Sequence, residues 1–258
     1  GGGLRDERHP SYQAWSYASH LTNFNEYVYE NRLSVSACAY LHNCNSQQIL
    51  QDKRYSEQTS KAPVFLKGDI ASLRTLIKKE IVSGSNEEAL RRIDSSPMRP
   101  SRQLAEVVGN MLQGNEEFVL LDDQKTVLEK IVNASTKSQV ETKQVLITKG
   151  GPGTGKSVIA INALARLSAL RLNARYITPN AAPRAVFEAK LKGSMPTVEI
   201  HELFSGSAAY AGIKKDSYDV LIVDEAHRLK LRSQYTKGGV NQIKEIIDSA
   251  RTSIFFID

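Results

Sequence analysis

The sequence has no uninterrupted apolar stretch of about 18 residues, which is roughly the length an α-helix needs to cross a membrane. It also has no internal repeat and no low-complexity tract, which argues against a solenoid or a disordered chain. Hydrophobic residues make up 41% of the 258 residues and charged residues 24%, as in ordinary soluble domains. These features predict a globular protein of the cytoplasm without a membrane partner.

Cysteine is scarce, occurring only at Cys38 and Cys44, with His42 between them. A structural zinc site takes four ligands, and only three candidates lie near one another in this stretch. The sequence therefore favours two buried, free thiols in a reducing compartment over a zinc site.

The chain lacks a starting methionine, and it stops at Asp258 directly after an apolar run at residues 254–257. We therefore expect a piece of a longer protein, cut at both ends, in which a targeting signal cannot be judged. Its length allows one large domain or two modest domains. Loop-forming residues near position 100 favour an N-terminal α+β region at residues 1–110 and a second domain at residues 111–258, incomplete at its C-terminus.

Basic residues outnumber acidic ones: the chain has 34 Lys and Arg and 28 Asp and Glu, which gives a formal net charge of +6 at pH 7. A basic surface suits a polyanion such as nucleic acid, but the same excess spread evenly is also ordinary for a soluble protein. The charge therefore permits a nucleic-acid partner without identifying one.

Residues 150–157 read Gly-Gly-Pro-Gly-Thr-Gly-Lys-Ser, the pattern of a phosphate-binding loop, between a short apolar strand and a predicted helix. The glycines allow successive backbone N–H groups to point at a β-phosphate, and the helix start adds a positive dipole. Lys156 is then expected on the β- and γ-phosphates and Ser157 on Mg²⁺. A glycine-rich turn is the alternative. The expected ATP-binding residues of the loop are Gly150, Gly151, Pro152, Gly153, Thr154, Gly155, Lys156 and Ser157.

An acidic pair, Asp224 and Glu225, follows an apolar run at residues 218–223 that is typical of a buried parallel strand. A carboxylate at the end of a strand beside a phosphate loop can hold Mg²⁺, and its neighbour can orient the attacking water. We therefore predict Asp224 as a metal ligand with Ser157, and Glu225 as a catalytic residue with Lys156. A helix N-terminus is the alternative for such a pair.

From Lys143 onward, strands and helices alternate, which predicts an α/β fold with a parallel sheet flanked by helices. Strands are expected at residues 144–148, 174–178, 197–201, 218–223 and 253–257. Before them, an apolar stripe at residues 12–28 predicts a helix, and alternating residues at 33–41 predict a strand. Another strand is expected at 63–66, and helices are expected at 69–82, 101–112 and 122–132.

With both nucleotide motifs in place, residues 118–258 resemble the first motor domain of superfamily 1 helicases, and most of all the Schlafen group 3-like DNA/RNA helicases. Further motifs carry the likeness at residues 121–124, 176–184, 197–203 and 256–258. The resemblance implies a RecA-like P-loop NTPase fold with ATP and Mg²⁺ as cofactors, DNA or RNA as partner, and a second motor domain after Asp258.

The same resemblance assigns further site residues. Gln124 would read the adenine edge, although a surface helix residue is the alternative. Contacts to the nucleic-acid backbone would come from Thr178, Asn180, Arg184 and His201. Thr and Asn are also ordinary capping residues, and a packed histidine is the alternative for His201.

The segment Gln13-Ala14-Trp15-Ser16-Tyr17 resembles a helix of RecB-like nucleases. The likeness implies that the nuclease strands with the metal ligands would precede Gly1. An aromatic core helix is the alternative.

These observations predict a helicase-like ATPase whose hydrolysis is coupled to DNA or RNA. Two alternatives stay open: a nucleotide-driven switch that controls an attached effector, and an ATP-stabilised scaffold that does not hydrolyse.

Overall fold

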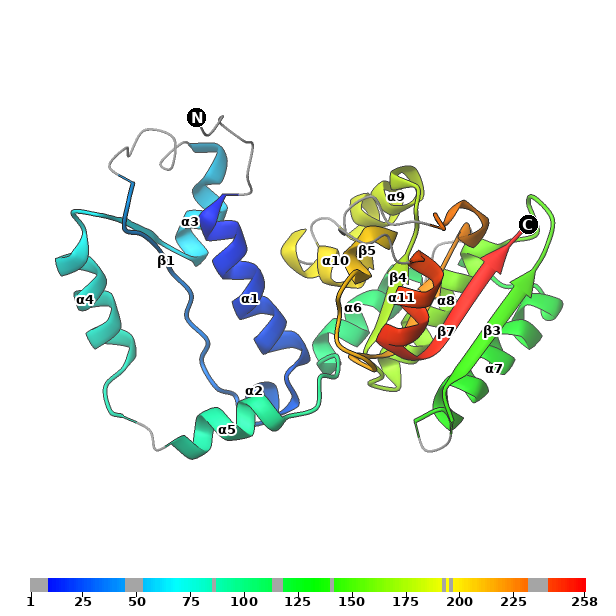
Figure 1. The fold of residues 1–258 in the computed structure, drawn as a ribbon, viewed down its shortest axis with the longest axis horizontal. Helices are drawn as coiled ribbons and strands as arrows, with labels where there is room; N and C mark the ends of the chain where they lie inside the picture. Colours follow the sequence, from blue (N-terminus) through cyan, green and yellow to red (C-terminus); the bar gives the residue numbers. More distant parts are fainter. Residues whose placement is uncertain are drawn as a thin grey trace. The chain divides into compact units, whose positions relative to one another are not determined.

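The computed structural model describes residues 9–44, 53–84, 87–112, 118–139, 142–191, 194, 197–231 and 241–258. The chain forms two compact units, Gly1–Pro97 and Met98–Asp258 (Figure 1). Helix α6 (Arg102–Leu112) packs against α8 (Lys156–Ala169) and therefore lies in the second unit. The division predicted between residues 110 and 111 would separate these two helices.

The first unit is mainly helical, with a small parallel sheet of strands β1 (Ala39–Leu41) and β2 (Val64–Leu66). Asn25 ends the first helix and caps the second: its Oδ1 accepts from the Val28 backbone N–H at 3.1 Å, and its Nδ2 donates to the Ile93 carbonyl at 2.8 Å. The helices are α1 (Pro10–Phe24), α2 (Glu26–Glu30), η1 (Lys53–Tyr55), α3 (Ser56–Lys61), α4 (Ile70–Glu80) and α5 (Glu87–Ser95).

The helix predicted at residues 12–28 is therefore two helices separated at Asn25. Trp15 is buried, as a core helix requires, whereas Gln13 and Tyr17 are exposed and form a hydrogen bond of 3.1 Å with each other. The likeness of this segment to a RecB-like nuclease stays a prediction.

The strand predicted at residues 33–41 is found only at Ala39–Leu41. Its partner β2 has three residues and follows Pro63, which has no N–H to continue the ladder. An alternating pattern without a partner strand does not make a strand. The prediction of buried thiols is also wrong for Cys38, which is exposed; Cys44 is half-buried, and both are free.

The second unit contains a five-stranded parallel sheet in the order β3-β7-β6-β4-β5. The predicted α/β sheet is thus confirmed. Its strands are β3 (Gln144–Lys149), β4 (Ala174–Ile177), β5 (Phe204–Ser205), β6 (Tyr218–Val223) and β7 (Ala250–Ile257).

Helices cover both faces of this sheet (Figure 1). α7 (Asp122–Lys137) and α8 pack on one face, and α11 (Gln242–Ser249) packs on the other, where Leu221 and Val223 join a buried cluster with Ile246. All four residues of 220–223 are fully buried, as expected for a central parallel strand. The remaining helices are α9 (Ala181–Leu191), α10 (Thr197–Leu203), η3 (Ser207–Tyr210) and η4 (Ala226–Arg228).

The strand predicted at residues 197–201 is wrong, because this segment belongs to helix α10. Five alternating residues fit either period, and here Val198, Ile200 and Leu203 are buried from a helix. The strand position beside β4 is taken by the next two residues, Phe204 and Ser205, which pair with Tyr176 and Ile177. Within the part of the chain that the structure describes, no helix combines the length and the apolar content of a membrane span.

Candidate nucleotide and nucleic-acid site

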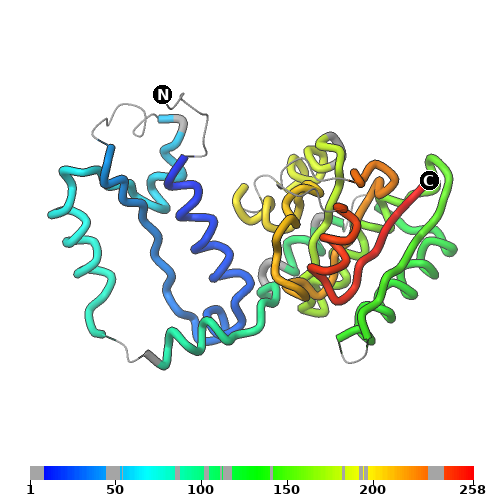
Figure 2. The backbone as a smooth tube through the Cα atoms, viewed as in Figure 1, coloured from blue at the N-terminus to red at the C-terminus, as the bar shows by residue number. Residues whose placement is uncertain are grey.

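Three strands of the parallel sheet bring the predicted nucleotide residues to one edge. β3 leads into the glycine-rich loop, β6 ends before Asp224, and β7 lies between them and ends before Asp258. Figure 2 shows the end of β7, marked C, at the same end of the sheet as the loop that follows β3. Parallel strands place their carboxyl ends together, which explains why motifs far apart in sequence meet here.

The glycine-rich loop is folded tightly on itself and on β7. The Gly150 N–H donates to the Ile257 carbonyl at 3.1 Å, and the Thr154 hydroxyl donates to the Gly151 carbonyl at 2.8 Å. Gly153 and Gly155 have φ values of 75° and 82°, in the left-handed region that favours glycine. The backbone of this loop therefore depends on its glycines.

Lys156, the first residue of α8, lies across the loop with 8% of its side chain exposed. Its Nζ donates to the carbonyls of Gly150 at 2.7 Å and Gly151 at 2.8 Å. The same ammonium lies 2.5 Å from Oδ1 of Asp258. The cation predicted to bind phosphates is thus held at the loop by two carbonyls and one carboxylate.

Gln124, in the first turn of α7, contacts the same loop. Its Nε2 donates to the Thr154 carbonyl at 3.0 Å, and its Oε1 accepts from the Leu121 backbone N–H at 2.9 Å. A β-carbon at Gly155 would collide with the Gln124 amide. Gln124 therefore supports the loop in this structure, and its reading of adenine stays a prediction.

Asp224 is fully buried and touches Ser157, the other residue predicted to hold Mg²⁺. Its Oδ2 accepts from the Ser157 hydroxyl at 2.6 Å and from the Tyr176 hydroxyl at 2.6 Å, while Oδ1 accepts from the Glu225 N–H at 3.0 Å. The two predicted metal ligands, from α8 and from the end of β6, are thus in direct contact.

Tyr176 was not among the site residues that the sequence predicted. It is fully buried in β4, where Phe187 and Phe204 pack around its ring. Burial, followed by the negative charge of Asp224, raises the pKa of the phenol far above its usual value of about 10. The hydroxyl thus stays protonated and remains a donor to Asp224. A buried tyrosine needs a polar partner for its hydroxyl, so a tyrosine within a buried strand is the signal in the sequence for such a contact.

Glu225 has a φ of 54°, which is uncommon for a residue with a side chain. This backbone directs its carboxylate toward two side chains of η4: Oε2 lies 3.1 Å from Nε of Arg228 and 3.4 Å from Nε2 of His227. A left-handed conformation costs about 1–2 kcal/mol for such a residue, and the two contacts offset part of this cost. The predicted catalytic carboxylate is therefore paired.

Asp258 is a further carboxylate at this edge, and the sequence did not predict it as a site residue. The hydrogen bond from Lys156 is the main reason that the pKa of Asp258 is lowered below its usual range. Its Oδ2 also lies 3.9 Å from Nε2 of His227. Asp258 thus links the loop lysine to the segment after the acidic pair.

The residues predicted to contact nucleic acid fall into two groups. Thr178 is buried at the end of β4, and its hydroxyl accepts from the Asn180 N–H at 3.3 Å, so it shapes the turn. Arg184 and His201 both face Glu188, at 3.4 Å and 3.7 Å from Oε1. The structure thus brings Arg184 and His201 together around one carboxylate.

A groove of about 390 Å³ lies beside the acidic pair, at the ends of β4 and β5. It is lined by Asn180 and by two cations, Arg228 and Lys230. Arg184 reaches the border of this groove, because its Nη1 would lie 3.3 Å from a β-carbon placed on Gly206. The lining residues are Pro179, Asn180, Gly206, Ser207, Ala208, Arg228, Lys230 and Gln242.

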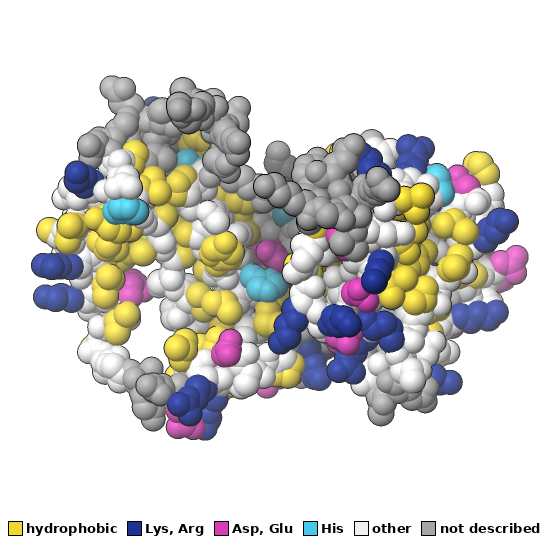
Figure 3. Space-filling model, viewed as in Figure 1, with side chains coloured by type: hydrophobic (Ala, Val, Ile, Leu, Met, Phe, Trp, Pro, Cys, Tyr) yellow, Lys and Arg dark blue, Asp and Glu magenta, His cyan; other side chains and the backbone are white. Residues whose placement is uncertain are grey.

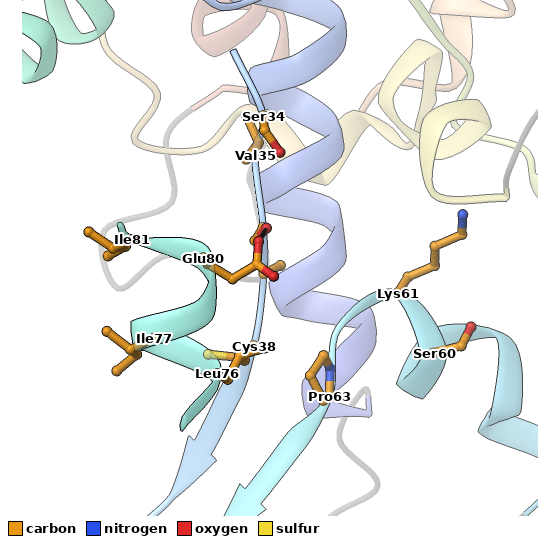
Figure 4. Close-up of a pocket in the computed structure, with 12 residues that line it drawn as sticks. Ser34, Val35, Cys38, Ser60, Lys61, Pro63, Leu76, Ile77, Glu80 and Ile81 are labelled. Carbon is orange, nitrogen blue, oxygen red and sulfur yellow. Dashed lines mark hydrogen bonds between the residues drawn. The ribbon is translucent and has the colours of Figure 1, made fainter. Parts of the chain in front are cut away.

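A second hollow, of about 510 Å³, lies within the first unit between α4, the segment before β1 and the connection from α3 to β2 (Figure 4). The Ser36 hydroxyl donates to Glu80 at 2.5 Å on its wall. Apart from Glu80 and Lys61, its lining is apolar or small, and Figure 3 shows exposed apolar side chains over this unit. Among the described residues, no group of three or more His, Cys, Asp or Glu side chains is arranged to hold a metal ion.

Comparison with known protein families gives a match to part of the second unit. The family model described as Schlafen group 3, DNA/RNA helicase domain, matches residues 143–258. This range contains the glycine-rich loop, the acidic pair and Asp258, and the match confirms the family that the motifs predicted. No curated protein matches the chain. Residues 143–258 are therefore similar to the Schlafen group 3 DNA/RNA helicase domain.

Proposed function

We propose that this chain binds Mg²⁺-ATP at the carboxyl edge of a RecA-like P-loop sheet, hydrolyses it, and couples hydrolysis to DNA or RNA. The observation that carries the proposal is the meeting of Lys156, Ser157, Asp224 and Glu225 at one edge, although they come from two distant parts of the chain. These side chains supply one cation, one hydroxyl and two carboxylates, the set that phosphoryl transfer requires.

Ser157 and Asp224 fit a magnesium site because they offer oxygen ligands, and their side-chain oxygens already lie 2.6 Å apart. Mg²⁺ would neutralise charge on the β- and γ-phosphates of ATP. Tyr176 would keep Asp224 in place when Ser157 turns its hydroxyl from the carboxylate toward the metal. The buried carboxylate would then keep one donor throughout.

Lys156 would exchange its two loop carbonyls for phosphate oxygens, which are stronger partners because they are charged, and it would leave the Asp258 carboxylate for the phosphates as well. Glu225 would orient the water that attacks the γ-phosphate and accept its proton. In this structure Oε2 of Glu225 is paired with Arg228 and His227, and release of the Arg228 contact would make the carboxylate a stronger base.

Two observations support nucleic acid as the partner. The matching family is a DNA/RNA helicase domain, and a groove with two cations adjoins the acidic pair. Asn180, Arg228 and Lys230 suit the sugar-phosphate backbone, whose contacts position a strand without reading its sequence. We therefore expect binding to DNA or RNA with little sequence preference.

The test is ATP hydrolysis by the chain with Mg²⁺, measured alone and with single-stranded DNA or RNA. Glu225→Gln should lower turnover by about two orders of magnitude while ATP binding remains, as expected when a positioned base is lost. Glu129→Gln, on the exposed surface of α7, is the matched control and should leave turnover unchanged. Equal turnover in the Glu225→Gln variant and the unaltered chain would contradict the proposal.

A further inference from the structure

Arg228 belongs to two sites at once. Its Nε lies 3.1 Å from Oε2 of Glu225, and its side chain also lines the groove that contains Asn180 and Lys230. Glu225 is the residue proposed to orient the attacking water, and the groove is the surface proposed for the nucleic-acid backbone. One side chain therefore contacts both the hydrolytic carboxylate and the polyanion surface.

We propose that Arg228 is the coupling residue of this chain: it holds Glu225 when the groove is empty and releases it when a nucleic-acid phosphate occupies the groove. This inference rests on the function proposed above. It assigns the phosphodiester backbone of a single strand to the groove and gives that strand a direct effect on hydrolysis.

The charges favour such an exchange. The Arg228 side chain is 55% exposed, so its pair with Glu225 is of the weak, solvent-screened kind. A guanidinium offers five N–H donors in a planar fork that suits phosphate oxygens, and the contact with Glu225 is made through Nε. A phosphate of a bound strand can therefore compete with Glu225 for Arg228.

His227 contacts Glu225 as well, at 3.4 Å, but it is not one of the residues that line the groove. It lies instead toward Asp258, at 3.9 Å from Oδ2. Only Arg228 therefore connects Glu225 to the groove among the side chains described at this edge. The geometry points to Arg228 as the residue through which bound nucleic acid changes ATP hydrolysis.

The experiment measures ATP turnover by the 258-residue chain at saturating Mg²⁺-ATP, with and without single-stranded oligodeoxythymidine or oligouridine of roughly 15 nucleotides, a typical site length. In Arg228→Ala, we expect basal turnover to rise by up to about five-fold, the most that loss of a weak surface pair can give. Adding either oligonucleotide at saturation should then raise turnover much less than in the unaltered chain. Its affinity for the oligonucleotide should also depend less on salt, with a slope smaller by about one.

Two variants serve as controls. Arg166→Ala removes an arginine of similar exposure, 60%, which has a glutamate partner on α7 away from the groove; it should leave turnover and oligonucleotide affinity unchanged. Lys230→Ala removes a second groove cation and leaves the pair of Arg228 with Glu225 in place. It should weaken oligonucleotide binding, but saturating oligonucleotide should still stimulate turnover.

Arg228→Gln, which keeps most of the side-chain length, repeats the measurement if Arg228→Ala melts early by circular dichroism. Arg228 variants that are folded, keep full stimulation and show no rise in basal turnover would overturn the inference. Failure of the proposed function has a different signature, because Glu225→Gln would then hydrolyse ATP as fast as the unaltered chain.

Discussion

Lys156 is the charged side chain on which nucleotide affinity should depend most. Replacing it with alanine removes the ammonium that faces the loop carbonyls but keeps the helix start of α8. We expect Lys156→Ala to weaken Mg²⁺-ATP binding by about 10- to 100-fold, as the loss of hydrogen bonds to a charged group predicts. Calorimetry measures the affinity. Lys125→Ala, an exposed lysine of α7, is the control, and unchanged affinity in a folded Lys156→Ala variant would contradict the loop assignment.

Tyr176 gives a second prediction at the residue scale. Tyr176→Phe keeps the ring among Phe187 and Phe204 but removes one of two hydroxyl donors to buried Asp224. The free energy of unfolding of this variant should be lower by about 1–3 kcal/mol, and the variant should need more Mg²⁺ to bind ATP.

Tyr210→Phe is the matched control for this prediction, since Tyr210 is equally buried and its hydroxyl bonds to Ser205 at 2.7 Å instead of to an acid. It should lose stability without a change in the Mg²⁺ requirement. The same Mg²⁺ requirement in both variants would show that Tyr176 acts only on packing.

The meeting of Ser157 with Asp224 follows from the sequence, because a phosphate loop and an acidic strand end share one edge of any parallel sheet. The positions of Tyr176 and Asp258 do not follow from it. They depend on the strand order, which places β7 beside the loop and β4 beside the acidic strand. The pair of Glu225 with Arg228 depends further on the left-handed backbone at Glu225, which no pattern of residue types specifies.

At the scale of elements, apolar runs were predicted well and alternating segments poorly. The structure has strands β3, β6 and β7 where apolar runs predicted them, and helix α7 begins at the predicted residue. Residues 197–201 and 33–38 carry five or six alternating residues, too few to separate a helix or an unpaired segment from a strand. In these two segments, the available partner strand determines which residues form a strand. β4 pairs with Phe204 and Ser205, and Pro63 ends the ladder between β1 and β2.

The start of β6 gives a prediction for stability against pH. Burial raises the pKa of Asp219 above its usual value of about 4, although its carboxylate accepts from the Asn173 N–H at 2.8 Å. A raised folded-state pKa means that stability is fully present below the usual pKa and is lost as pH rises through the folded value.

Asp219→Asn keeps an oxygen for the Asn173 N–H and removes the charge, so the variant should gain stability relative to the unaltered chain as pH rises from about 4 toward neutrality. Urea unfolding of both proteins across this range measures the difference. A difference that is constant with pH would mean that Asp219 ionises as easily in the folded protein as in the unfolded chain.

At the scale of the whole molecule, the question is where the nucleotide-binding unit begins. The sequence predicts a division after residue 110, whereas the chain's contacts divide it at Pro97 and Met98. The difference is helix α6, whose residues Ala105 and Val108 are buried and which packs on α8. Since α8 begins at Lys156, loss of α6 would expose the helix that presents the phosphate loop.

We therefore expect a fragment of residues 98–258 to fold in one cooperative transition and to bind Mg²⁺-ATP as tightly as the whole chain. The free energy of unfolding of a fragment of residues 111–258 should be lower than that of residues 98–258 by at least about 2 kcal/mol, because burial of Val108 alone contributes that much. Thermal and urea unfolding of the two fragments, with ATP titration of each, makes the comparison. Equal stability and affinity in both fragments would show that α6 is dispensable and that the division predicted at residue 110 is the better one.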